Sequence, residues 1–125
     1  MTVRAGATLV LALAALPAGA AGPDPLAGHV AGVAKRCVDL DSNEALVAVD
    51  ERTIVHRESA RRTWVTHPVG PCPGLAAGAT LIVDRFGSQV CRDDRFRTIR
   101  IGQSIPSAVC RFDVFTPYDR PRRAP

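Results

Sequence analysis

The residues of this chain best suited to chemistry are four cysteines: Cys37, Cys72, Cys91 and Cys110. Thiols can form disulfides, bind a metal ion or carry redox equivalents. No two of them have the C-x-x-C spacing of zinc ribbons and thioredoxin-like sites. An even number of widely spaced cysteines is typical of structural disulfides in exported chains. We therefore expect two structural disulfides and no metal site.

Three pairings of the four cysteines are open, and spacing alone does not choose between them. We favour Cys72–Cys91, which closes a loop around one apolar run, and Cys37–Cys110, which ties the first predicted strand to the last. First and last strands often become neighbours when a barrel closes.

The three histidines, His29, His56 and His67, are candidates for metal binding or proton transfer. The hairpin register predicted below places His56 opposite Thr63 and His67 opposite Arg52. That puts these two roughly 13 Å apart at the rise of a strand. We expect all three to be surface or rim residues, with no metal and no cofactor.

Carboxylates and hydroxyls give only weak signals of catalysis. Asp39 with Asp41, and Asp93 with Asp94, could act as acid–base pairs, but acidic residues in such positions usually form turns. The loop serines lack a G-x-S-x-G context and a local base; they are Ser59, Ser88, Ser104 and Ser107. We assign no catalytic residue, and ligand-binding residues stay unknown. Trp64 could line a groove, but core packing is the favoured role.

The N-terminus resembles a secretory signal. Arg4 supplies a positive charge, residues 9–16 are apolar, and Ala18-Gly19-Ala20 is a small-x-small cleavage site. The apolar run is shorter than the roughly 20 residues that cross a bilayer, so we expect no transmembrane segment in the mature chain. The prediction is a signal at 1–20 cleaved near Ala20, and a periplasmic or secreted protein.

The rest of the chain has the pattern of a small all-β domain. Short apolar runs alternate with turn signals about every ten residues, without a convincing helix. The candidate strand segments are 33–39, 45–49, 53–57, 62–67, 79–84, 89–91, 96–101 and 108–115. We predict an all-β fold: a disulfide-stapled antiparallel barrel or sandwich of six to seven short strands. A flexible lead-in covers 21–28, the single domain 29–118 and a disordered basic tail 119–125.

One hairpin can be predicted in detail, from 53–57 and 62–67. If Glu58 lies opposite Arg61, the two form an ion pair. The same register places Val55 opposite Trp64, which is a favourable aromatic–branched pair. In the last strand, the two-residue period puts Cys110, Phe112 and Val114 inward.

The net charge of +4 comes from the ends of the chain. Without Arg4 and the tail arginines Arg120, Arg122 and Arg123, 12 of the 16 basic residues remain, equal to the 12 acidic ones. A neutral body argues against nucleic-acid binding. The three tail arginines could bind an anionic envelope polymer or an envelope protein.

Several pieces together resemble a known family. They are Cys37, the run Val49-Asp50-Glu51-Arg52-Thr53-Ile54, the box Cys72-Pro73-Gly74-Leu75, Cys91 followed by Asp93 or Asp94, and Cys110 two residues before Phe112. They are similar to those of small exported proteins of Gram-negative bacteria grouped as a four-cysteine domain of unknown function. The resemblance covers 30 to about 118. It implies a periplasmic, disulfide-linked β domain and carries over no catalytic residue.

These observations favour a non-enzymatic binding or structural module of the cell envelope. Two alternatives stay open: a small periplasmic hydrolase with a site of loop aspartates and a histidine, and an accessory subunit that binds a partner by strand addition.

Overall fold

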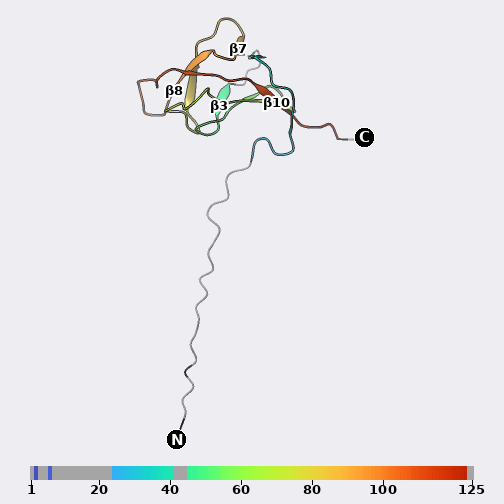
Figure 1. The fold of residues 1–125 in the computed structure, drawn as a ribbon, viewed down its shortest axis with the longest axis vertical. Helices are drawn as coiled ribbons and strands as arrows, with labels where there is room; N and C mark the ends of the chain where they lie inside the picture. Colours follow the sequence, from blue (N-terminus) through green and yellow to red (C-terminus); the bar gives the residue numbers. More distant parts are fainter. Residues whose placement is uncertain (1, 3–5, 7–23, 41–44, 124–125) are drawn as a thin grey trace.

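The protein folds as an all-β domain (Figure 1). The computed structural model describes residues 24–40 and 45–123, together with Thr2 and Gly6. The predicted signal at 1–20 lies outside the described residues except at those two positions. The described residues form ten strands: β1 Val30–Ala31, β2 Cys37–Asp39, β3 Leu46–Ala48, β4 Ile54–Arg57, β5 Arg62–Thr66, β6 Thr80–Val83, β7 Gln89–Cys91, β8 Arg95–Ile99, β9 Cys110–Arg111 and β10 Thr116–Asp119. Within the described residues, no helix has the length and apolar character needed to cross a membrane.

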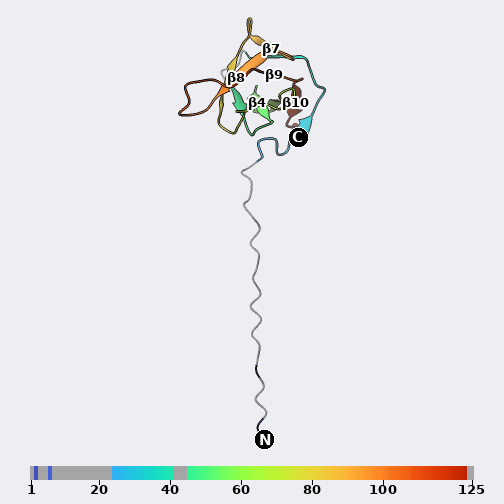
Figure 2. The ribbon, with the colours of Figure 1, turned by 60° about the vertical axis from the view of Figure 1, so that its left-hand side comes forward.

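The strands form three antiparallel sheets. The largest has five strands in the order β1-β10-β5-β4-β3, and the others are β2-β7 and β6-β8-β9. Figure 2 shows β7, β8 and β9 on one side of the body and β4 and β10 on the other. The arrangement is sandwich-like and not a closed barrel, and it has more and shorter strands than the six to seven predicted.

The core lies between the sheets and takes side chains from all three. Val38 and Val90 come from the two-stranded sheet, Ile54 from the five-stranded sheet and Phe96 from the three-stranded sheet, and all four are buried. The ring of Phe112 stacks on Phe96 with centroids 4.3 Å apart. Burial of such rings is the main force that holds the layers together.

The predicted last strand, 108–115, is interrupted. Its ladder ends at Arg111, after which Phe112 forms an isolated bridge to Pro68, and Phe115 forms another to Lys35. Phe112 and Phe115 are both buried, whereas Val114 is only half-buried. The two-residue alternation was therefore wrong beyond Phe112, because the chain crosses there from one sheet to another.

The predicted hairpin is confirmed as β4 and β5, but its register was wrong by one residue. His56, rather than Val55, lies opposite Trp64. The turn explains the difference: the amides of Glu58 and Ser59 both donate to the carbonyl oxygen of Arg62. Because Arg62, not Arg61, closes the turn, every later pair shifts by one position.

The predicted disulfide pairing, Cys72–Cys91 and Cys37–Cys110, was wrong. The disulfides are Cys37–Cys91 and Cys72–Cys110, and they use all four cysteines. Cys37 and Cys91 lie opposite each other in the β2–β7 ladder. The first and last predicted strands do meet, but at Lys35 and Phe115. Cys110 instead lies in β9 of the three-stranded sheet, away from the β2–β7 ladder that holds Cys37.

The end of the domain extends one residue past the predicted limit of 118. β10 runs to Asp119, whose carboxylate accepts hydrogen bonds from Arg62 Nε at 2.7 Å and Nη2 at 3.0 Å. Beyond it, Arg120, Arg122 and Arg123 are exposed. The Arg120 amide donates to the carbonyl of Arg61 at 2.8 Å, so the tail leaves the body beside the β4–β5 turn.

Candidate functional site

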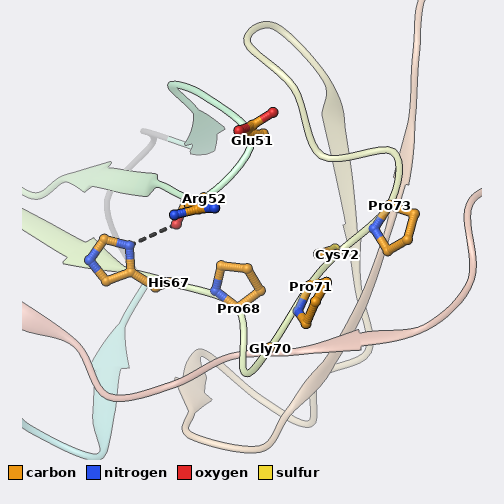
Figure 3. A pocket seen from close by; sticks show the side chains of 8 residues that line it. All are labelled: Glu51, Arg52, His67, Pro68, Gly70, Pro71, Cys72 and Pro73. Atoms are coloured by element: carbon orange, nitrogen blue, oxygen red, sulfur yellow. Dashed lines mark hydrogen bonds between the residues drawn. The ribbon is translucent and has the colours of Figure 1, made fainter.

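A cleft runs between the turn that joins β3 to β4 and the proline-rich segment that follows β5 (Figure 3). It consists of two adjoining hollows of about 570 and about 860 Å³. Both are bordered by Glu51, Arg52 and His67. The first is also lined by Pro68, Gly70, Pro71, Cys72 and Pro73. The second is also lined by Asp50, Thr53, Leu75, Ala76, Ala77 and Arg100.

One side of the cleft, here called the lip, is the turn between β3 and β4. Asp50 Oδ1 accepts a hydrogen bond from the Arg52 amide at 2.7 Å, and the Val49 amide donates to the Thr53 carbonyl at 2.9 Å. The bond from the Arg52 amide lowers the pKa of Asp50, with smaller contributions from Thr53 and His67. The lip is therefore a fixed turn that carries a stable negative charge.

The lower wall is formed by proline rings on an anchored segment. The Val69 amide donates to the Arg111 carbonyl at 2.9 Å, and the Asp113 amide donates to the His67 carbonyl at 2.9 Å. Cys72, four residues after Pro68, is tied to Cys110 by a disulfide. Proline fixes its own backbone angle, so the wall keeps its shape without a regular ladder.

His67 joins the two walls. Its Nδ1 lies 2.7 Å from the carbonyl oxygen of Arg52, and Figure 3 shows this bond at one end of the cleft. A carbonyl only accepts hydrogen bonds, so Nδ1 carries the proton and Nε2 of the neutral ring is an acceptor. The ring is exposed. It can hold a ligand's N–H or O–H donor at that end.

The other two histidines lie elsewhere. His29 is half-buried, with Nδ1 3.2 Å from the Ala27 carbonyl. His56 is fully buried, so the expectation that it lies on the surface or rim was wrong. The one-residue shift in register turns His56 toward the core, where it lies opposite Trp64 and Leu46. In the described part of the chain, no three His, Cys, Asp or Glu side chains form a metal-binding group.

The paired aspartates serve the backbone. Asp94 Oδ2 accepts a hydrogen bond from the Cys91 amide at 2.8 Å. Asp93 has a positive φ of 72° and faces Arg111, with Oδ1 3.8 Å from Nη1. Asp39 is exposed at the end of β2, and Asp41 lies outside the described residues. The described members of these pairs belong to turns and strand ends, not to the cleft.

Two of the loop serines also act on the backbone. Ser59 Oγ accepts from the Arg62 amide at 3.1 Å. Ser107 Oγ accepts from the Thr98 amide and donates to the Ala108 carbonyl, both at 2.9 Å. Ser88 and Ser104 are exposed. None of the four lines the cleft.

The aromatic residues divide between core and surface. Trp64 is buried, as expected for core packing, and its Nε1 donates to Glu58 Oε1 at 3.3 Å. Phe86 is fully exposed at the β6–β7 turn. Among the described residues, no Phe, Tyr or Trp side chain lines the cleft.

The cleft was not predicted from the sequence, because its two walls come from segments that are separated along the chain. The predicted hairpin placed His67 opposite Arg52, but that register was wrong by one residue. The two residues are joined instead by the bond between His67 Nδ1 and the Arg52 carbonyl.

A scan against family models found no match, and neither curated proteins nor solved structures gave one. The cleft is therefore interpreted from its own chemistry.

Proposed function

We propose that this protein is an exported binding module that holds an extended segment of a partner polypeptide in the cleft. The observation that carries the proposal is the contrast between the two walls. Pro68, Pro71 and Pro73 form one side, and the charged side chains of Glu51 and Arg52 border the other (Figure 3).

The size and chemistry of the cleft suit such a ligand. Each of its two hollows, of about 570 and about 860 Å³, is in the range of ordinary ligand sites, roughly 300–1,000 Å³. Proline rings offer apolar surface to side chains of the segment. Glu51 and Arg52 lie side by side with opposite charge, which matches the paired donors and acceptors of a peptide backbone better than a ligand of one sign.

The alternatives have less support in the described residues. The hydrogen bond of His67 in the cleft goes to the Arg52 carbonyl, whereas a hydrolytic site of the expected kind pairs a histidine with a carboxylate. The outer strands of the five-stranded sheet are short: β1 has two residues and β3 has three. Short edges discourage strand addition.

Export is the other half of the proposal. Two disulfides are typical of an oxidising environment. We therefore also propose cleavage near Ala20 and a periplasmic location. The resemblance to exported four-cysteine proteins supports both. N-terminal sequencing of the protein recovered from the envelope checks it, since a chain that retained Met1 would contradict it.

The cleft is tested by photo-crosslinking in the producing cell. With a benzophenone amino acid in place of Glu51, we expect an adduct with an envelope polypeptide. The matched control is the same substitution at Arg57, an exposed charged residue that does not line the cleft. Equal labelling from both positions, or none from position 51, would contradict the proposal.

The Kd for the polypeptide identified in this way then shows whether the cleft recognises it or only lies near it. Arg52→Glu should weaken the purified complex about tenfold or more, because it replaces one of two opposite charges by a repulsive one. Arg57→Glu should leave the Kd nearly unchanged.

A further inference from the structure

The outer face of the β6-β8-β9 sheet combines arginines with exposed isoleucine. Phe96 and Thr98 of β8 are buried, so the alternation of a strand turns Arg95 and Arg97 to the opposite face. Arg111 of β9 lies directly opposite Arg95, and Ile82 of β6 lies opposite Arg97. Ile82 is 42% exposed.

The positive charge of this face is only partly balanced. Two arginines directly opposite each other on neighbouring strands repel. Arg111 has one acidic neighbour, Asp93, at 3.8 Å, and Arg95 borders a hollow that Asp84 and Asp94 also line. Among the described residues, Arg97 makes no ion pair, so its charge at the centre of β8 is uncompensated.

That loop, 100–109, projects from the body beyond β8 (Figure 2). Ile101 is 99% exposed and Ile105 81% exposed, and Val109 at its end is 43% exposed. Apolar side chains at these levels of exposure gain nothing from the core of their own domain. Exposed apolar groups gathered in one place mark interaction sites.

We propose that this surface, formed by Ile82, Arg95, Arg97, Arg111, Ile101 and Ile105, docks on an anionic phospholipid membrane. Ile101 and Ile105 insert among the acyl chains, and the arginines contact lipid phosphates. The shape of the surface favours a lipid bilayer over a folded protein. Acyl chains can rearrange around apolar side chains on a projecting loop. The arginines of β8 and β9 supply attraction to anionic headgroups. None of these residues lines the cleft.

The test is co-sedimentation of the purified, disulfide-bonded mature chain with vesicles. One set is pure phosphatidylcholine, and the other is equal parts phosphatidylcholine and phosphatidylglycerol. We expect partitioning about tenfold or more stronger on the phosphatidylglycerol vesicles, weakening as salt is added. Ile101→Asp should reduce it about tenfold or more, since it removes an inserted side chain and adds a like charge to the lipid. Arg97→Gln should reduce it about fivefold.

Matched controls separate this surface from general charge. Arg57→Gln removes an exposed arginine elsewhere, and Val33→Asp alters an apolar residue that is 83% exposed on another part of the chain; neither should change partitioning by more than about twofold. Ile101→Trp should show a blue-shifted emission on the anionic vesicles, whereas Val33→Trp should not.

Three results would overturn the proposal. One is equal partitioning to both kinds of vesicle. Another is partitioning that survives Ile101→Asp and Arg97→Gln but is lost when Arg120, Arg122 and Arg123 are replaced by glutamine, which would assign binding to the tail. A third is equally tight binding to soluble polyglutamate, abolished by Arg97→Gln but not by Ile101→Asp, which would point to an acidic protein.

Discussion

The five-stranded sheet and the two smaller sheets are held together in different ways. In the large sheet, β3, β4 and β5 follow one another along the chain and pair as neighbours. In the small sheets, β2 pairs with β7, and β6 pairs with β8. Both disulfides lie outside the large sheet: one joins β2 to β7, and the other joins the proline segment to β9. Both covalent links thus join segments outside the large sheet, and one of them crosses the three-residue pairing of β2 with β7.

The largest expected effect comes from removing these links. Replacing all four cysteines by serine should abolish the fold, because each disulfide contributes up to about 4 kcal/mol by the chain-entropy model for separations of 54 and 38 residues. That is comparable with the whole stability of a small domain. Circular dichroism during thermal unfolding measures it.

A sharper form of this experiment removes only Cys37 and Cys91. Amide hydrogen exchange should then lose protection first in β2 and β7, while β4 and β5 keep theirs. Equal loss of protection in β4 and β5 would show that the two regions unfold as one unit and would remove the contrast.

A smaller effect is expected at the glycine of the Cys72-Pro73-Gly74-Leu75 box. Gly74 has φ +96°, and a Cβ there would lie 2.9 Å from Thr98 Oγ1 and 3.1 Å from Ser107 Cβ. Gly78 has φ +77° but no atom within 4 Å of its Cβ position. Gly74→Ala should cost about 2–3 kcal/mol and Gly78→Ala about 1 kcal/mol, since only the first adds a clash to backbone strain. Urea unfolding of both variants compares them, and equal losses would show that the box tolerates a side chain.

The smallest effect belongs to the large sheet and depends on pH. The hydrogen bonds from Arg62 lower the pKa of Asp119 below its ordinary value of 3.8. The unfolded chain therefore binds a proton first as pH falls, so this stabilisation is complete above the unfolded pKa and is lost as pH falls through the folded one. Thermal unfolding of Asp119→Asn should show a lower Tm than the parent near neutral pH and a gap that closes in acid. A gap that stays constant with pH would rule out the carboxylate charge as its source.

The parts of the fold that the sequence predicts are those set by neighbouring residues. The β4–β5 hairpin and the positions of most single strands follow from local alternation and turn chemistry. The hairpin register failed because Ser59 supports a longer turn than the pairing of Glu58 with Arg61 allows. The local pattern was enough to locate the two strands but not to set the register in which they pair.

The pairing of the cysteines and the cleft could not be predicted, because both depend on which distant segments meet. Cys37 joins Cys91 since β2 pairs with β7, and no local signal specifies that pair. The cleft likewise needs the Asp50 turn beside the proline segment. His56 was misplaced for a related reason, since one position of register separates a surface histidine from a buried one.

The two disulfides interleave along the chain, because Cys72 lies between Cys37 and Cys91, and Cys91 lies between Cys72 and Cys110. A polypeptide that enters an oxidising compartment from its N-terminus presents Cys37 and Cys72 before either native partner has arrived. The first bond available to it is a mispairing, which only thiol–disulfide exchange can undo. Efficient maturation of this protein therefore calls for a disulfide isomerase, and a host without one should accumulate scrambled isomers.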